Sequence, residues 1–566
     1  MTNKAIAGPL KETAALIELT GGNSFRARAL ANAARIIERL ETPVATLIES
    51  GEFTTIKGLG TGLAAQVNEI LHYGSFELRD DILGGLPPGL LDVLSVKGLG
   101  AKKVRALWQK LSVQSLDDLE GAALSGRIAE LEGFGKKSQE SILENLTLLR
   151  SFQGKRRLAN GFADAEIIQQ TLEAHPAVSS VSQTGTLARR MEIVENLSFV
   201  VSAPPDQAEN ICSLLPFPVT VSSEESRYCA IGELPDGLQV VLLFCEPENC
   251  GVNVLRETGP ESFVSAFLND HPTVVGSSEQ DLFEQAGARF LAPELRDLPN
   301  AWERRDTLSA LPLLKPEQLK GVLHNHSTYS DGAHTLREMS LACRNAGYEY
   351  FGICDHSQSL RIASGMSVET LMRQKAEIAA LNAEFEGDSG SSFRVFFGVE
   401  SDILGDGSLD YPDEVLAEFD MIVASIHVRF NMTETEATDR IIRAVANPYT
   451  TILGHPTGRL ILKRAGYPLD HEAVLQACAL HGVAIELNAS PYRLDLDWRW
   501  IERAVELNVP VAINPDAHSI EQLDLMKWGV VAARKGGLTA RHCLNALSLS
   551  DFKSFLHAKK IASGIV

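Results

Sequence analysis

The sequence predicts a multidomain chain with a helical N-terminal region, a mixed α/β middle region and a C-terminal barrel of parallel strands and helices. Its 566 residues are enough for several domains, each with its own core. Three similar Gly-x-Gly pieces lie before residue 151, and seven apolar runs that end in polar residues follow residue 320. The first pattern is typical of short helices joined by tight turns, and the second of alternating strands and helices.

The composition is that of a soluble globular protein, with 45% hydrophobic and 22% charged residues. We find no signal-like start and no apolar run long enough to span a bilayer, so a cytoplasmic protein without a membrane partner is expected. Eight irregularly spaced cysteines indicate reduced thiols. Cys245 and Cys250 lack a matching second pair, so a structural zinc site is not expected there. The net charge of −21 argues against broad electrostatic adhesion to nucleic acid but leaves room for local phosphate contacts.

The three N-terminal pieces each contain an apolar residue, a Gly-x-Gly turn and the start of a helix. Glycines permit a tight turn, and the free N–H groups of the helix that follows suit a phosphate. Their candidate DNA-binding residues are Gly58, Gly60, Gly98, Gly100, Lys102, Lys103, Gly133, Gly135, Lys136 and Lys137. The pieces resemble the helix-hairpin-helix motif, which holds the DNA backbone without reading bases. Purely structural hairpins are the alternative, most plausible for the first copy because it has no lysine pair.

Residues 1–150 as a whole resemble the N-terminal part of bacterial family X DNA polymerases. The matching marks are residues 23–29, the segment 69–74 after the first hairpin, and the paired downstream hairpins. The resemblance implies a DNA-binding domain at 1–80 and a fingers-like domain at 81–150. Some members carry a Schiff-base lysine for deoxyribose-phosphate lyase activity after the first hairpin. The matching residues here contain no lysine, so we do not expect that activity.

The same resemblance implies a nucleotidyltransferase-like α+β palm and thumb at residues 151–300. The family places two aspartates one residue apart on a palm strand, and here Asn196 and Ser198 stand at those positions. The strand at 238–244, where a third acid is expected, has none, and Glu195 points to the opposite face. Because two-metal nucleotidyl transfer needs such carboxylates, polymerase activity is expected to be lost. An active polymerase with unconventional palm residues is the alternative.

The C-terminal region repeats a short apolar run, a polar end and a helical stretch. The runs are Gly321–His326, Tyr350–His356, Arg394–Glu400, Met421–His427, Thr451–His455, Val483–Asn488 and Val511–His518. Continuous apolar runs are typical of parallel strands buried on both faces, and in such barrels chemistry gathers at the carboxyl ends of the strands. The candidate metal ligands at or just after these ends are His324, His326, Asp331, His356, Glu400, His427, His455, Asp516 and His518. A core would not bury so many polar groups without partners.

Residues 320–566 resemble the PHP (polymerase and histidinol phosphatase) domain, a distorted (β/α)7 barrel that holds up to three divalent metals. The resemblance implies the nine residues above as ligands, and imidazole-rich sites suit manganese or zinc, with iron as an alternative. Arg429 and Arg459 follow ligand strands and are candidates to clamp a phosphate oxygen, with ion pairs at the barrel rim as the alternative. Asp355 should point away from His356, and either support of the site or helix capping is expected of it rather than metal binding.

These features predict a DNA-binding, metal-dependent phosphoesterase. In polymerases that the chain resembles, the PHP domain is associated with 3′-5′ exonuclease and end-processing activity in base excision repair. One alternative is a small-molecule phosphatase of the histidinol phosphatase type, which would have no use for three DNA-binding hairpins. Another is a non-catalytic DNA-binding scaffold, which a complete set of ligands argues against.

Overall fold

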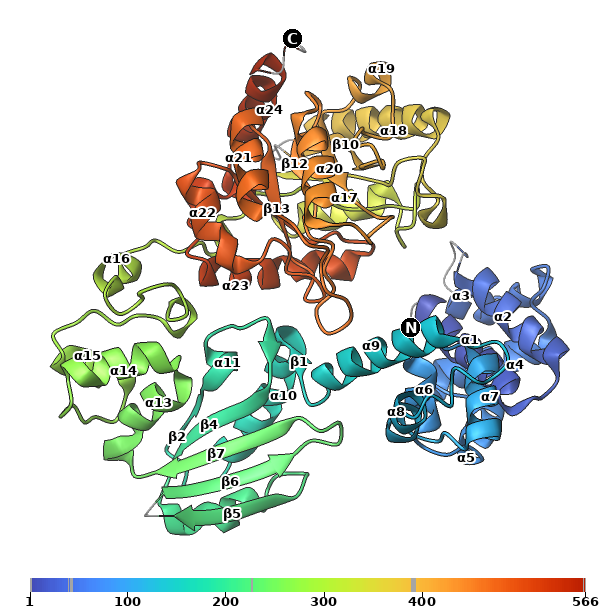
Figure 1. Cartoon of the computed structure of the whole chain (residues 1–566). Helices are drawn as coiled ribbons and strands as arrows, with labels where there is room; N and C mark the ends of the chain where they lie inside the picture. The colour runs from blue at the N-terminus through green and yellow to red at the C-terminus, as the bar shows by residue number, and fades with distance from the viewer. Residues whose placement is uncertain are drawn as a thin grey trace. The chain divides into compact units, whose positions relative to one another are not determined.

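The computed structural model describes residues 3–38, 40, 44–224, 227–387, 393–562 and 564. The chain forms two compact units, Met1–Gln153 and Gly154–Val566, which are considered separately below (Figure 1). No helix in these described ranges is long and apolar enough to cross a membrane.

The first unit is helical, as predicted. Its elements are α1 (Asn3–Thr20), α2 (Ser24–Glu38), α3 (Val44–Glu49), α4 (Thr61–Tyr73), α5 (Glu77–Gly84), α6 (Leu90–Ser95), α7 (Ala101–Leu111), α8 (Leu116–Leu124) and α9 (Lys136–Phe152). Two small apolar cores hold them, one mainly among α1 to α4 and one mainly among α6 to α9. Helix α1 joins the two cores, since Leu10 and Ile17 pack into the first and Leu16 and Leu19 into the second.

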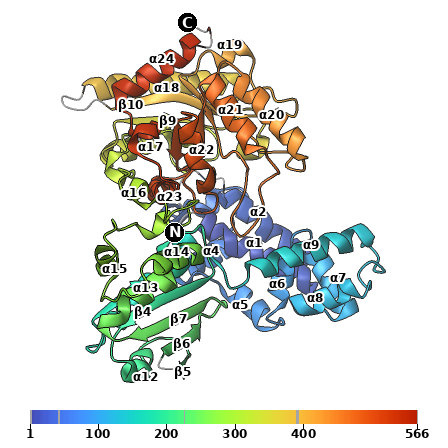
Figure 2. The same ribbon diagram turned by 60° about the vertical axis from the view of Figure 1, so that its left-hand side comes forward.

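The second unit begins with a mixed five-stranded sheet. Its order is β2 (Ser180–Gln183), β4 (Asn196–Ser202), β7 (Gln239–Cys245), β6 (Arg227–Glu233) and β5 (Val219–Glu224). Strands β4 and β7 are parallel and the other neighbours are antiparallel. One face of the sheet shares a core with α10 (Leu158–Glu173), and a smaller apolar cluster joins the other face to α13 (Cys250–Thr258). Figure 2 shows the sheet with α13 and α14 (Glu261–Asp270) above it.

The barrel is a sheet of seven parallel strands in sequence order. They are β8 (Gly321–Val322), β9 (Tyr350–Ile353), β10 (Arg394–Asp402), β11 (Met421–Ser425), β12 (Ile452–Leu453), β13 (Ala484–Asn488) and β14 (Val511–Asn514). The two edges nearly close, because Asn325 bridges Ala517 and the His326 N–H donates to the Ala517 carbonyl at 2.8 Å. The predicted barrel is therefore confirmed.

Most barrel strands end earlier than predicted. The predicted runs extended to the candidate ligands, whereas β9 ends at Ile353 and β11 at Ser425. Beyond these points the backbone leaves the regular ladder, and only single bridges such as His356 with Glu400 remain. Helices that follow strands cover the barrel, including α17 (Leu336–Asn345), α18 (Val368–Gly387), α20 (Glu434–Ala446), α21 (His471–His481) and α23 (Met526–Lys535).

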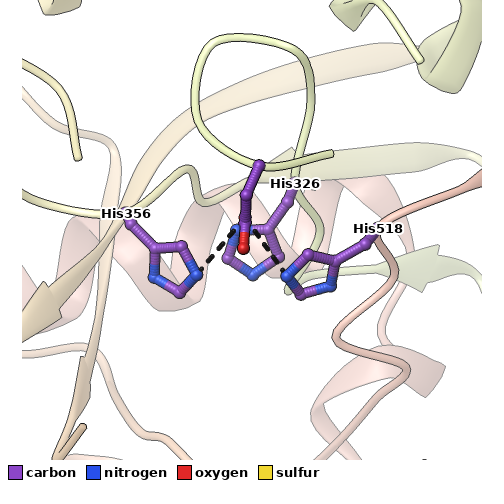
Figure 3. A group of neighbouring side chains, drawn as sticks. His326, His356 and His518 are labelled. Atoms are coloured by element: carbon purple, nitrogen blue, oxygen red, sulfur yellow. Dashed lines mark ion pairs between the residues drawn. The ribbon is translucent and has the colours of Figure 1, made fainter. Parts of the chain in front are cut away.

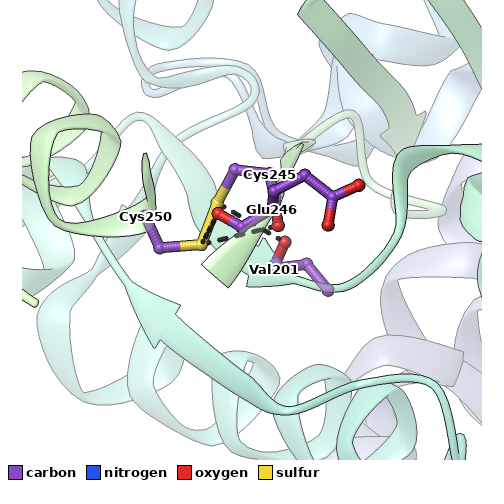
Figure 4. Close-up of a disulfide and its surroundings, with 4 residues drawn as sticks. All are labelled: Val201, Cys245, Glu246 and Cys250. Atoms are coloured by element: carbon purple, nitrogen blue, oxygen red, sulfur yellow. Dashed lines mark hydrogen bonds between the residues drawn. A yellow bond between two sulfur atoms is a disulfide. The ribbon is translucent and has the colours of Figure 1, made fainter. Parts of the chain in front are cut away.

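The expectation that all eight cysteines are reduced is wrong for two of them. Cys245, at the end of β7, and Cys250, at the start of α13, form a disulfide with their Cα atoms 5.7 Å apart (Figure 4). Both side chains are buried, and Val200 and Leu243 pack beside them. Sequence spacing could not show this pair, because a strand-to-helix turn brings the two residues together. Cys212, Cys343, Cys354, Cys478 and Cys543 are free thiols.

The segment after the mixed sheet shares one continuous core with the barrel. Leu255, Phe267 and Trp302 belong to the same apolar cluster as the barrel strands. Within this segment Arg296 is buried, and its guanidinium donates to both carboxylate oxygens of Glu279 at 2.6 and 3.1 Å. A buried charge of this kind is stable only while its partner is present.

We predict that Arg296→Ala destabilises the second unit by about 3–5 kcal/mol, since it leaves the Glu279 carboxylate buried without its cation. The measurement is the free energy of unfolding in urea. Arg337→Ala is the matched control, because Arg337 and Glu384 form an exposed pair, and exposed pairs contribute about 0–1 kcal/mol. Equal effects of the two substitutions would contradict the prediction.

Candidate functional site

The carboxyl ends of the barrel strands carry three overlapping groups of potential metal ligands. Their members are His326, Asp331, His356 and His518; His324, His326, Glu400 and Asp516; and His356, Glu400 and His427. Within each group the ligand atoms all lie within 4.8 Å of one another. Parallel strands direct all their carboxyl ends to one side of the sheet, which explains why residues nearly 200 positions apart meet here. Figure 3 shows His356 and His518 paired with one carboxylate, with the His326 ring between them.

Glu400 lies at the centre of the groups. It is 1% exposed, and its oxygens lie 2.9 Å from His356 Nδ1, 3.1 Å from His427 Nε2 and 3.0 Å from His455 Nε2. Through this last contact His455, which belongs to none of the three groups, joins the cluster. The structure thus brings together all nine residues proposed as ligands from the sequence.

Several polar atoms in the cluster are buried and lack a hydrogen-bond partner. They are His324 Nε2, His326 Nδ1 and His455 Nδ1, together with His356 Nδ1 and Glu400 Oε2, which lie 2.9 Å apart as an ion pair but are not aligned for a hydrogen bond. Buried nitrogen and oxygen atoms are nearly always paired, because an unpaired one costs free energy. A mixed set of imidazole and carboxylate donors around such atoms fits divalent cations such as zinc or manganese.

Two further carboxylates orient the histidines from behind. Glu486 Oε2 lies 2.7 Å from His324 Nδ1, and Asp402 Oδ1 lies 2.8 Å from His427 Nδ1. Each carboxylate is placed to accept the Nδ1–H of its histidine, and Nε2 of the same ring faces the cluster. Sequence reasoning missed both residues. The available signals were a lone acid in the apolar run at 484–488, and Asp402 two positions beyond Glu400, hence on the same side of β10.

Asp355 supports the loop that carries Asp331, as predicted. It is fully buried and accepts hydrogen bonds from the Ser327 N–H at 2.8 Å, the Ser327 hydroxyl at 2.7 Å and Gln374 Nε2 at 2.6 Å. These bonds fix residues 327–330, so the Asp331 carboxylate approaches His356 and His518 at 3.5 and 3.3 Å.

Charge in the cluster is shared between histidines and carboxylates. Burial lowers the pKa of His427, but Glu400 and Asp402 outweigh it and raise the pKa to about 10. Burial also lowers the pKa of His518, but Asp331 and Asp516 outweigh it and raise this pKa to about 9. His326 differs, because burial and the neighbouring His518 and His356 lower its pKa to about 3. Cations that bind here compete with protons on His427 and His518.

The two arginines proposed as phosphate clamps lie in different environments. Arg429 is exposed in the loop after β11 and has a left-handed backbone, with φ of 60°. Arg459 contacts none of the nine clustered residues, because its guanidinium is paired with Asp497 and donates to the carbonyls of Arg493 and Leu494. A third arginine, which sequence reasoning missed, lies closer to the cluster: Arg493 Nε is 3.8 Å from Asp516 Oδ2.

The three N-terminal turns have the geometry expected of anion-binding hairpins. Gly58, Gly98 and Gly133 have φ of 99°, 91° and 84°, a conformation that side chains disfavour. Gly60, Gly100 and Gly135 then act as N-caps of α4, α7 and α9, and no side chain caps any of the three helices. Their first N–H groups are therefore available to a ligand. Lys102, Lys136 and Lys137 are exposed, whereas Lys103 donates to the Gly98 carbonyl at 3.2 Å.

The mixed sheet presents neutral side chains at its expected acidic positions. Asn196 and Ser198 lie on the same face of β4, and Ser198 pairs with Val241 of β7. The buried Ser198 hydroxyl accepts a hydrogen bond from Thr184 at 2.9 Å, and Glu195 pairs with Lys155 at 2.8 Å. Within the described residues, every group with metal-ligand spacing lies in the barrel.

Comparisons with known proteins agree with this arrangement. Residues 1–76 match the family model described as a helix-hairpin-helix domain. The chain is 34% identical to the DNA polymerase/3′-5′ exonuclease PolX of Bacillus subtilis (strain 168), over 98% of this chain and 99% of that protein. Its C-terminal part is 27% identical to a probable phosphatase of Thermoanaerobacter sp. (strain X514), over 42% of this chain and 94% of that protein. A probable phosphatase of Syntrophotalea carbinolica is 25% identical over 39% of this chain and 90% of its own length.

The position of Glu486 generates a prediction. Glu486→Gln should weaken the binding of manganese or zinc by about 10- to 100-fold, because His324 loses the carboxylate that fixes its ring. Titration of metal-stripped protein, followed by calorimetry, measures the affinity. Glu472→Gln is the control, since Glu472, on α21, forms a surface pair with Arg503 away from the cluster. Unchanged affinity in Glu486→Gln would show that His324 needs no carboxylate behind it.

Proposed function

The chain belongs to the PolX family, and on that premise we propose that it is a metal-dependent phosphoesterase that degrades DNA from 3′ ends. The observation that carries the proposal is the convergence of nine histidines and carboxylates at one end of the barrel, where several buried ligand atoms make no hydrogen bond. The similarity to the PolX of Bacillus subtilis supports a 3′-5′ exonuclease or end-processing role in DNA repair.

We propose up to three divalent ions, manganese or zinc with iron as an alternative, held by His324, His326, Asp331, His356, Glu400, His427, His455, Asp516 and His518. Each pair of groups has one residue in common, and these shared residues are His326, His356 and Glu400. Shared ligands support neighbouring rather than separate ions. When bound, such ions lower the pKa of water and neutralise charge on a phosphoryl group. The protein's own part is to fix the ligands, through Glu486, Asp402 and Asp355, and to offer Arg429 and Arg493 to phosphate oxygens.

We propose that the three hairpins hold the backbone of DNA without regard to sequence. Uncapped helix ends beside exposed lysines support this role, and the net charge of −21 confines DNA contact to such local sites.

We also propose that the chain has four parts, at 1–80, 81–150, 151–300 and 320–566. Separate apolar cores in the first unit support the first boundary, and the division after Gln153 supports the second.

We propose that the palm has lost polymerase activity. Asn196, Ser198 and Val241 offer no carboxylate on the face where two metal ions would be needed, which supports this reading.

A small-molecule phosphatase is a second candidate, because the phosphatase relatives match the barrel part alone. The hairpins count against it.

Purified protein with manganese should shorten a 5′-labelled single DNA strand from its 3′ end, and His326→Ala should reduce the rate to background because His326 belongs to two of the ligand groups. Gel analysis of the products measures both rates. His557→Ala, an exposed histidine of α24 (Leu549–Ala562), should behave as the wild type.

The same reaction with a primer–template and deoxynucleoside triphosphates distinguishes the alternatives. Extension of the primer would contradict the proposed loss of polymerase activity. Release of phosphate from histidinol phosphate, with DNA left intact, would favour the small-molecule phosphatase.

Combined Lys102→Ala and Lys136→Ala should weaken binding to unrelated DNA sequences equally and lower the slope of log K against log salt by about 2, one for each lost phosphate contact. Fluorescence anisotropy at several salt concentrations measures the slope. Lys315→Ala with Lys553→Ala removes two exposed lysines of the second unit and is the matched control. An unchanged slope in the hairpin variant would favour purely structural hairpins.

A further inference from the structure

A loop beside the metal ligands exposes an aromatic ring. Tyr492, in the loop that follows β13, is 51% exposed, although the residues around the cluster are mostly buried. The loop is held in place, because the Ile461 N–H donates to the Tyr492 carbonyl at 2.6 Å and the Arg493 N–H to the Ser490 carbonyl at 2.7 Å. Asn488, at the start of the loop, donates to Asp516 at 3.1 Å, so the loop is tied directly to a proposed ligand.

Two arginines lie in or beside this loop: Arg493 belongs to it, and Arg464 pairs with Leu460, the neighbour of the Ile461 that donates to Tyr492. Arg493 Nε lies 3.8 Å from Asp516 Oδ2. Arg464 lies over the Phe430 ring at 4.2 Å and donates to the Gly458 carbonyl at 2.6 Å. Burial lowers the pKa of Arg464, and the like charge of Arg493 lowers it further. Two neighbouring guanidinium groups repel each other, and an anion such as a phosphodiester would relieve the repulsion.

The mixed-sheet domain covers one side of the tyrosine. The Arg157 guanidinium lies 3.8 Å from the centre of the Tyr492 ring, a cation–π contact. Arg157 Nε is buried and lacks a hydrogen-bond partner. Strand β1 (Arg156–Arg157) pairs with β3 (Ile193–Val194), and Glu192 just before β3 accepts hydrogen bonds from the barrel at 3.0 Å from Trp498 and 2.8 Å from Arg499. These bonds dock the arginine against the barrel loop.

We propose that Tyr492, Arg493, Arg464 and Arg157 form a nucleotide subsite beside the metal centre. The exposed face of Tyr492 stacks on one base of the strand being cleaved, and Arg493 and Arg464 hold the phosphate next to that base. Arg157 supports the ring from its other side, so the domain that has lost its acidic residues contributes to the barrel's substrate site. This inference rests on the proposed function, because it assumes that the barrel cleaves DNA.

If Tyr492 stacks on one base, removal of that base from the DNA and removal of the Tyr492 ring should abolish the same contact. Their effects on kcat/KM should therefore not add. Oligonucleotides that lack the base at the 3′-terminal or at the penultimate position are compared with the complete strand. Wild-type protein should lose about tenfold in kcat/KM on one of the two, since base–aromatic stacking contributes about that factor. Tyr492→Ala should lose about tenfold on the complete strand and nothing further on that abasic strand. Tyr492→Phe should behave as the wild type.

Arg157→Ala should lower kcat/KM on the complete strand about threefold, because the ring loses its cation–π contact. The rate on the abasic strand should not change. Arg503→Ala, on the barrel surface and paired with Glu472, should change neither rate. If Tyr492→Ala slows both strands equally, or neither, the stacking role is wrong.

Two further measurements separate this inference from the proposed function. Hydrolysis of glycerophosphoglycerol, a phosphodiester without an aromatic ring, by the wild-type protein with manganese tests the metal centre alone. Binding of a fluorescent, phosphorothioate-linked tetranucleotide tests the subsite without cleavage, and Tyr492→Ala should weaken it about tenfold. Weakened binding supports the subsite even if DNA is not cleaved, and unchanged binding overturns it even if DNA is cleaved.

Discussion

Glu400 lies buried among the rings of His324, His326, His356, His427 and His455, and its charge has to be balanced inside the barrel. A carboxylate without compensation in such a place would be very costly. Without metal, protons on the histidines supply the positive charge, as the raised pKa of His427 indicates. Divalent cations would replace these protons and satisfy the nitrogen lone pairs as well. The barrel's carboxyl end is therefore arranged around one electrostatic requirement, and the carboxylates behind the histidines, Glu486 and Asp402, serve the same requirement.

The sequence allowed the barrel and its ligands to be predicted for a physical reason. Parallel strands buried on both faces leave long apolar runs, and polar residues at their ends stand out against them. Glu486 lies inside such a run rather than at its end, so only the closed barrel reveals that it faces His324. Arg493 and Tyr492 lie in a loop, where no hydrophobic periodicity predicts the direction of a side chain. Their positions depend on the path that brings this loop beside Asp516. The Cys245–Cys250 disulfide depends likewise on the angle between a strand and a helix.

The mixed sheet packs well with neutral side chains at the positions where the sequence comparison with polymerases expects acids. Its core is made by Leu197, Phe199 and Val201 on the face of β4 opposite Asn196 and Ser198, so neutral replacements there leave the packing intact. A carboxylate at the position of Ser198, which is 7% exposed, would be costly without a bound cation. The serine instead accepts a hydrogen bond from Thr184. Neutral side chains at these positions therefore suit a sheet that has no bound cation.

Contacts with the barrel hold the sheet domain in place. Lys535 of α23 is fully buried and donates to Asp297 at 2.6 Å and to the Arg189 carbonyl at 2.9 Å, so it joins the barrel to the turn that precedes β3. The thumb-like segment shares the barrel's apolar core through Phe267 and Trp302. Removal of the sheet and this segment would expose that core and leave the Lys535 ammonium without Asp297. The sheet domain thus contributes to the stability of the barrel whatever its own chemistry, and its Arg157 side chain lies against Tyr492 of the barrel loop.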